Sequence, residues 1–192
     1  MAATESTMLE LGTPAPYFAL PDLGGKIVCI DDFWQAKALL VAFICPHCPY
    51  VRHIRGGLAQ VAHDYLPRGL AVVAIMPNDI DSYPQDGPEG MRQEAEEAGY
   101  TFPYLFDKTQ GITRSYHAAC TPDLFLFDQP RLLVYRGQFD GSRPGNGVPV
   151  TGADLRAAID AVLSGSPVPA EQVPSIGCGI KWKPGRAPED FR

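Results

Sequence analysis

Two cysteines separated by two residues form the pattern with the most evident chemistry in the sequence, Cys45-Pro46-His47-Cys48. The pattern follows a buried-strand signal at residues 38–44, and Pro46 suits the first turn of a helix, where its missing N–H is harmless. We therefore expect Cys45 at or near the helix N-cap, where unpaired N–H groups and the helix dipole favour a thiolate. A protonated His47 would lower the pKa of that thiol further. In this arrangement Cys45 attacks a disulfide, and Cys48, one turn deeper, resolves the mixed disulfide.

The same spacing supplies two thiolates to a metal, so zinc is the first competing interpretation. A zinc site needs two more ligands, and an iron–sulfur cluster needs similar partners. The sequence offers Cys120, Cys178, His53 and His117, none of which forms a second closely spaced pair. The position between a strand and a helix favours redox chemistry, and we expect no metal.

An alternation of predicted strands and helices positions the cysteine pattern. The apolar runs at residues 38–44 and 70–76 are typical of strands buried on both faces of a sheet. The other predicted strands lie at residues 17–20, 26–30, 102–106, 123–127 and 132–139, and the helices at residues 46–65, 88–98, 108–116 and 152–163. The first two and the last two of these strands are expected to pair as hairpins. This order predicts an α/β fold with a central mixed sheet and helices on both faces.

Composition and charge limit the classes of partner. The chain has 192 residues and a net charge of −6, without the cluster of Lys and Arg that a nucleic-acid surface needs. Its apolar runs are too short for a membrane-spanning helix, and its first twelve residues lack the features of a signal peptide. We expect a cytoplasmic protein that binds neither nucleic acid nor a membrane. The acidic run at residues 94–97 predicts a solvated helix face.

Five cysteines in a chain of this length do not indicate a secreted disulfide framework. Residues 1–164 are predicted to form one domain, and residues 165–192 an irregular Pro/Gly-rich tail that could dock on it. Cys178 in that tail is a candidate for an additional redox residue, because docking could bring it over the pair. Cys120 is a second candidate, and Cys29 is expected in the core.

The chain also resembles the thioredoxin-fold superfamily in its order of elements, its CxxC pattern at the first long helix, and Thr121-Pro122 ahead of the last hairpin. The resemblance implies a thioredoxin-like fold in which a cis Pro122 faces the two cysteines and Thr121 presents backbone groups to the substrate. The segment Gly12–Leu20 resembles the opening of the peroxiredoxin and alkyl hydroperoxide reductase branch, which implies an N-terminal β-hairpin extension. Segments Phe43–Val51 and Ser175–Gly185 are similar to a bacterial group of peroxiredoxin-like proteins.

The sequence differs from these relatives at positions that distinguish two enzymatic interpretations. Peroxiredoxins carry Pro-x-x-x-Thr-x-x-Cys, but Ala38 and Ala42 stand at the Pro and Thr positions before Cys45, and Cys48 also lacks both residues. Pro122 stands where peroxiredoxins have an arginine. We therefore predict a thiol–disulfide oxidoreductase, with a thiol-dependent peroxidase as the alternative. A non-enzymatic redox sensor or metal-binding module is the second alternative.

Thioredoxin itself has a Trp before its first cysteine and a buried Asp six residues before it, and here these positions hold Ile44 and Leu39. The direction of exchange, reducing or oxidising, stays open. The expected partners are a protein or small-molecule disulfide and a thiol electron donor, for a monomer or a homodimer. The redox pair Cys45–Cys48 is the active group, and no further cofactor is expected.

Overall fold

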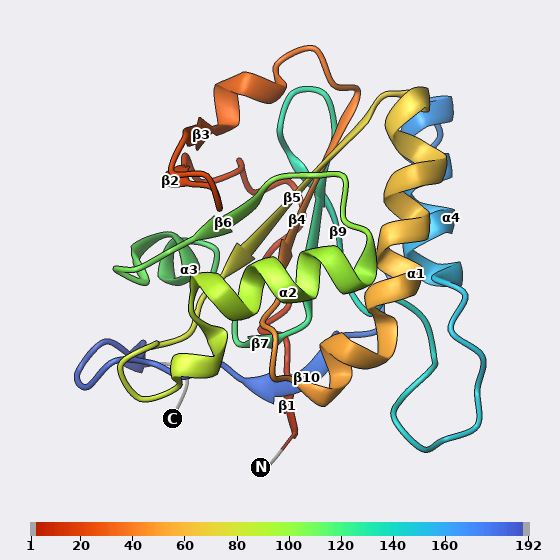
Figure 1. The fold of residues 1–192 in the computed structure, drawn as a ribbon. Coiled ribbons are helices and arrows are strands. Elements are labelled where there is room, and N and C mark those ends of the chain that lie inside the picture. The colour runs from red at the N-terminus through yellow and green to blue at the C-terminus, as the bar shows by residue number, and fades with distance from the viewer. Residues whose placement is uncertain (1–2, 190–192) are drawn as a thin grey trace.

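The computed structural model describes residues 3–189 and is built on a five-stranded mixed sheet (Figure 1). From one edge to the other its strands are β6 (Tyr104–Phe106), β5 (Leu70–Met76), β4 (Ala38–Phe43), β8 (Asp123–Phe127) and β9 (Leu133–Arg136). The β4–β5 and β5–β6 pairs are parallel, whereas the β4–β8 and β8–β9 pairs are antiparallel. The predicted mixed sheet and its closing hairpin are confirmed.

Three helices, α1 (Pro49–Tyr65), α2 (Pro88–Ala98) and α4 (Ala153–Ser164), pack on one face of this sheet. Side chains alternate along a strand, so Leu40 of β4 faces these helices while its neighbour Val41 faces the other side. Figure 1 shows α2 in front of the sheet, with α1 and α4 together at one side. β4 and β5 are apolar throughout because both of their faces are buried.

The opposite face is covered by shorter elements. They are the short helix α3 (Gly111–Ser115) and the N-terminal hairpin of β2 (Ala19–Pro21) and β3 (Ile27–Cys29). The predicted N-terminal hairpin is therefore confirmed, and helices flank both faces, although unequally. Cys29, expected in the core, is only partly buried in β3.

A second sheet contradicts the prediction of an irregular C-terminal tail. β10 (Ile176–Gly179) lies between β1 (Ala3–Glu5) and β7 (Cys120–Thr121) and is antiparallel to both. Ile176, Cys178 and Ile180 alternate with two glycines, but glycine is depleted in strands, so this short segment gives only a weak strand signal. The strand forms because segments from both ends of the chain supply its backbone partners. Residues 1–2 and 190–192 of the predicted domain and tail lie outside the described residues.

The first long helix begins later than predicted. Residues 46–47 form a turn, in which the Cys48 N–H donates to the Cys45 carbonyl (3.4 Å), and α1 begins at Pro49. Pro49, at the first helical position, is the proline whose missing N–H is harmless. The N-cap is therefore Cys48, and Cys45, which was predicted at or near the N-cap, lies three residues before it.

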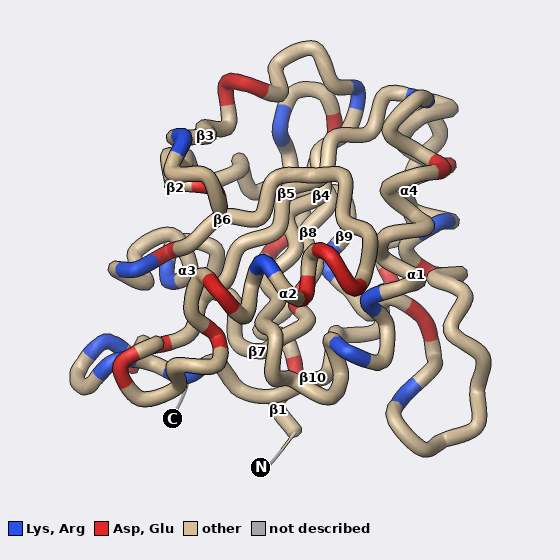
Figure 2. Tube along the Cα trace, in the orientation of Figure 1, with Lys and Arg blue, Asp and Glu red and all other residues tan. Residues whose placement is uncertain are grey.

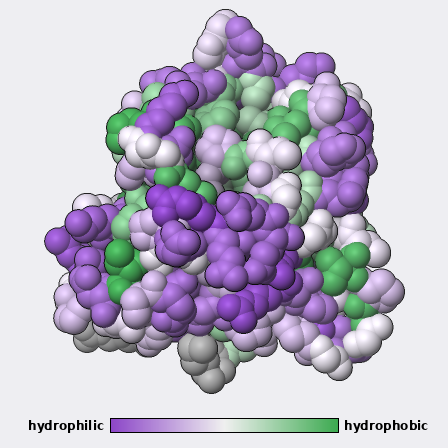
Figure 3. Space-filling model, viewed as in Figure 1, coloured by the Kyte–Doolittle hydropathy of each residue, from purple (hydrophilic) through white to green (hydrophobic). Residues whose placement is uncertain are grey.

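The surface is mostly polar and mixed in charge. Figure 2 shows acidic segments on α2, and the same region is hydrophilic in the space-filling view of Figure 3. Glu94 is an exception to the predicted solvated face, because its side chain is buried and accepts a hydrogen bond from Tyr104 Oη (2.9 Å). Within residues 3–189, no helix combines the length and apolarity that crossing a bilayer requires.

Candidate active site

The two thiols of the CxxC pattern meet where β4 leads into α1. Both cysteines are free thiols, fully buried, and close enough to each other for each to shift the pKa of the other. The pKa of Cys48 is lowered to about 5, first because the Cys45 thiol donates to its sulfur, and further by donors that include the Val51 N–H. The pKa of Cys45 is raised because its thiol donates its proton toward Cys48, because it is buried, and because Asp86 is negatively charged. The reduced pair can thus hold one negative charge, and the helix N-terminus directs that charge to Cys48.

The Thr121–Pro122 peptide bond is cis, as the resemblance implied, and lies against both cysteines. Thr121 Oγ1 is 3.4 Å from Cys45 Sγ, so a hydroxyl lies beside this sulfur. The Thr121 carbonyl accepts a hydrogen bond from the protonated Cys48 thiol (3.0 Å). The structure therefore brings together all of the residues predicted for attack, resolution and substrate positioning.

The tail strand β10 occupies the edge at which Thr121 was expected to receive a substrate. Cys178 lies directly opposite Thr121 in the antiparallel pairing, and Gly179 lies opposite Cys120. The Cys178 thiol is close enough to Cys48 to lower the pKa of Cys48, while burial raises its own pKa to about 12. Because β10 covers this edge, the pair is closed to a disulfide substrate in this conformation.

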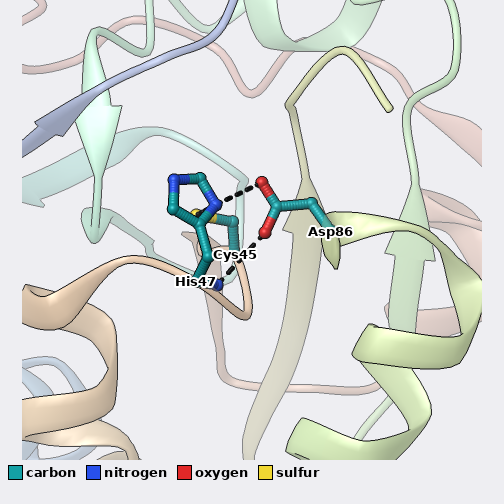
Figure 4. A group of neighbouring side chains, drawn as sticks. All are labelled: Cys45, His47 and Asp86. Carbon is teal, nitrogen blue, oxygen red and sulfur yellow. Dashed lines mark hydrogen bonds and ion pairs between the residues drawn. The ribbon is translucent and has the colours of Figure 1, made fainter. Parts of the chain in front are cut away.

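His47 has a partner that the sequence did not reveal. Its Nδ1 lies 2.6 Å from Asp86 Oδ2, and its backbone N–H donates to Asp86 Oδ1 (3.1 Å), as Figure 4 shows. Asn78 Nδ2 donates to the same carboxylate (2.8 Å), and the Tyr83 ring stacks on the imidazole at 5.7 Å. Asp86 is fully buried and fixes the turn that carries His47.

This geometry changes the expected tuning of the thiolate. Cys45 Sγ lies 3.9 Å from the same His47 Nδ1 that is bound to Asp86. The carboxylate therefore competes with the sulfur for that nitrogen, and its charge raises the pKa of Cys45. Asp86 lies in a Pro/Gly-rich loop with no motif to mark it, so only its buried hydrogen bonds identify it.

Pro46 and Cys120, two other predicted site residues, have mainly structural contacts. The Pro46 carbonyl accepts a hydrogen bond from Arg52 Nε (2.8 Å), which closes the turn onto α1. The Cys120 thiol donates to the Pro122 carbonyl (3.4 Å), and burial raises its pKa strongly. A thiol held protonated in this way is a poor nucleophile.

One group of described residues could offer three ligand atoms to a metal ion, namely Cys45, His47 and Asp86, within 4.8 Å of one another. This group differs from the ligands that a zinc interpretation would recruit from the sequence. His53, one of those, pairs instead with Ser142 Oγ (2.6 Å). A metal would also have to displace the contact between His47 and Asp86, so the fit is poor.

The chain is similar to known proteins in both sequence and structure. The family model described as AhpC/TSA matches residues 11–136. The thiol–disulfide oxidoreductase ResA of Geobacillus kaustophilus is 24% identical over 126 residues, which are 66% of this chain and 68% of ResA. A crystal structure of a hypothetical protein from Sinorhizobium meliloti has a TM-score of 0.93 and 54% identity, covering 95% of this chain and all of that one.

The fold is thioredoxin-like, as predicted. The thioredoxin domain of a thiol–disulfide oxidoreductase from Bacteroides vulgatus has a TM-score of 0.57 at 22% identity, with 67% of this chain and 88% of that one covered. At this identity the likeness concerns the fold alone.

Proposed function

The chain belongs to the AhpC/TSA family, and we propose that it catalyses thiol–disulfide exchange through Cys45 and Cys48. The observation that carries the proposal is the contact of two buried thiols with each other and with Thr121, next to the cis Pro122. Two neighbouring thiols on one turn of the chain are suited to form a disulfide, which requires their Cα atoms to lie within about 7 Å of each other. The resemblance to ResA in sequence supports the same chemistry.

The asymmetry of the pair is the reverse of the predicted one, because Cys48 rather than Cys45 holds the thiolate, but it still fits attack on Cys45 by an incoming thiol. In disulfide exchange the thiol with the lower pKa is the better leaving group. Since Cys48 has the lowered pKa, opening of the Cys45–Cys48 disulfide by a thiol occurs at Cys45 and releases the Cys48 thiolate. In the reverse direction Cys45 carries the mixed disulfide, and Cys48 attacks Cys45 Sγ to release the substrate thiol.

A substrate must first gain access to the buried pair. β10 lies on the Thr121 edge, where an extended substrate chain would pair with the backbone. We therefore propose that a protein or small-molecule disulfide reaches Cys45 when β10 separates from β7. A thiol donor then returns the pair to its reduced form, and the redox pair itself is the only group that the cycle needs.

We also propose that the protein works in the cytoplasm. The partly exposed Cys29 in β3 is a free thiol, and exposed free thiols are typical of a reducing compartment. In such a compartment the pair would act as a reductant.

The test is dithiol-dependent reduction of a protein disulfide such as that of insulin. The wild type is expected to accelerate reduction, Cys45→Ser to be inactive, and Cys48→Ser to accumulate a mixed disulfide with the substrate. Cys120→Ser is the matched control, because the Cys120 thiol is buried nearby but bonded to Pro122 O. Full activity of Cys45→Ser, or a mixed disulfide that forms only on Cys48, would overturn the assigned roles.

Peroxide reduction is a second candidate, favoured by one contact. Peroxiredoxins have a threonine hydroxyl three residues before the cysteine, and this chain has none there. Thr121 Oγ1, from another strand, lies 3.4 Å from Cys45 Sγ and could replace that hydroxyl. An antioxidant role would follow from this activity. Consumption of hydrogen peroxide with a dithiol donor measures it, and Thr121→Val should abolish peroxide turnover if the hydroxyl orients the peroxide.

A further inference from the structure

A third thiol lies next to the redox pair on the strand that closes the site. Cys178 is directly opposite Thr121, whose carbonyl is 3.0 Å from Cys48 Sγ. Cys178 and Cys48 belong to the same buried cluster as Cys45, and Cys178 is close enough to Cys48 to influence its pKa. Cys48 thus neighbours both Cys45 and Cys178.

The position of Cys178 is fixed by contacts on both sides of it. Before the cysteine, Ser175 Oγ donates to the Gly137 carbonyl (2.7 Å), and the Ser6 N–H donates to the Ser175 carbonyl (2.9 Å). After it, the Ile180 N–H donates to the Ala119 carbonyl (3.1 Å). These bonds hold Cys178 beside Cys48 while β10 is closed.

The glycine before Cys178 permits this close approach. A Cβ atom on Gly177 would lie 2.0 Å from the Thr121 carbonyl oxygen, closer than any real contact. A side chain at this position would hold β10 away from β7 and carry the Cys178 sulfur away from Cys48. The Gly-Cys-Gly sequence is therefore suited to bring a thiol, rather than a bulky side chain, to the pair.

We propose that Cys178 is a third redox residue, which forms a disulfide with Cys48 and so rearranges the oxidised pair. This step rests on the proposed function of Cys45 and Cys48. Cys178 Sγ attacks Cys48 Sγ of the Cys45–Cys48 disulfide. An external thiol opens this disulfide at Cys45, but β10 places Cys178 beside Cys48, so the internal attack is directed to Cys48. Because burial raises the pKa of Cys178, the step depends on this proximity. The new sulfur–sulfur bond forms as the old one breaks, and the proton lost by Cys178 is taken up by Cys45. No electrons enter or leave, so this step needs no further oxidant.

The product has two properties that the Cys45–Cys48 disulfide lacks. Cys45 becomes a free thiol again, and the disulfide now joins Cys48, at the start of α1, to Cys178 in β10. The disulfide also ties β10 to the site covalently, so the oxidised protein stays closed to new substrate until a thiol donor reduces it. The Cys120 thiol is bonded instead to the Pro122 carbonyl.

The link can be mapped because the redox pair, Cys120 and Cys178 lie in three separate tryptic peptides. Cys45 and Cys48 share peptide 38–52, Cys178 lies in peptide 157–181, and Cys120 lies in peptide 115–131. The full-length wild type and Cys45→Ser are each treated with one equivalent of diamide, quenched with acid, alkylated, digested and analysed by mass spectrometry.

We expect peptides 38–52 and 157–181 to be linked in part of the wild type and in most of the Cys45→Ser protein. Fragmentation should assign the link to Cys48. The double variant Cys45→Ser/Cys178→Ser should lose the link, and Cys45→Ser/Cys120→Ser should keep it. Peptide 157–181 recovered fully alkylated from both proteins, or linked to peptide 115–131, would overturn the proposal.

The insulin assay separates this result from the proposed function. Reduction by the wild type without the cross-link removes the role of Cys178 and leaves exchange at Cys45 and Cys48 intact. A cross-link without reduction of insulin by the wild type would instead contradict the proposed enzymatic function.

Discussion

Substitution of Gly177 should open the site, because this glycine lies where β10 closes on β7. An alanine Cβ would lie 2.0 Å from the Thr121 carbonyl oxygen and 2.6 Å from its carbon, both of which are backbone atoms that cannot rotate away. Gly179, in the same strand, is a matched control. Its Cβ would meet Thr4 Oγ1 at 2.9 Å, the end of a side chain that can change rotamer.

The size of the effect follows from the cost of overpacking. Forcing an extra methyl group into a closely packed position costs about 1–3 kcal/mol. If that cost falls on the closed state, the population in which β10 is open rises roughly 5- to 150-fold, since 1.4 kcal/mol corresponds to about a factor of ten. The buried Cys45 and Cys48 react only when the strand is open, so their rate should rise by the same factor.

The assay is the rate of reaction with 5,5′-dithiobis(2-nitrobenzoate) in a Cys29→Ser background, which removes the partly exposed thiol. Gly177→Ala should react faster than the parent by the stated factor, and Gly179→Ala should stay close to it. Ser175→Ala, which removes the bond to the Gly137 carbonyl, is a milder second way to loosen the strand. Thermal unfolding of each variant shows whether opening is local. Equal rates for the two glycine variants, both folded, would refute the reasoning that β10 controls access.

Three further outcomes are expected. Asp86→Asn removes a negative charge that raises the pKa of Cys45, so the pH profile of alkylation at Cys45 should move to lower pH, and an unchanged profile would count against this electrostatic role. Burial raises the pKa of Glu94 from 4.5 to about 7, so the folded state binds the proton more tightly than the unfolded state. Stability from this carboxyl, up to about 3 kcal/mol, is therefore present below pH 4.5 and lost as the pH rises through 7. Urea unfolding across this range should show the trend in the wild type and a weaker one in Glu94→Gln. Metal analysis of protein purified without oxygen or chelator should find less than one zinc per chain, since His47 Nδ1 is bound to Asp86, whereas a full equivalent would favour a metal-binding module.

Much of the fold was predictable because its signals are local. The apolar runs of β4 and β5 reflect burial on both faces of the sheet, and the hairpins follow from turn residues between short apolar segments. The position of the cis proline was predicted through resemblance, and Thr121–Pro122 lies against the cysteines as expected.

The errors occurred where remote segments decide the local structure. α1 begins at Pro49 because the chain turns at residues 46–47, and two prolines three positions apart, Pro46 and Pro49, made either start plausible from the sequence. Glu94 belongs to an acidic run that reads as a solvated face. It is buried because Tyr104, on a neighbouring strand, supplies a hydrogen-bond donor. No pattern in the helix alone contains that information.

The sequence by itself determined the chemistry that is available: two thiols at CxxC spacing after a buried strand, a Thr-Pro pair to face them, and further cysteines that could join them. Only the tertiary structure decided how these groups share charge and access. The helix N-terminus lies at Cys48 rather than Cys45, the buried Asp86 holds His47, and β10 brings Cys178 to the pair while closing it. The physical reason is that pKa values and exposure depend on which groups pack together from distant parts of the chain, whereas spacing and apolar patterns report only on neighbours in sequence.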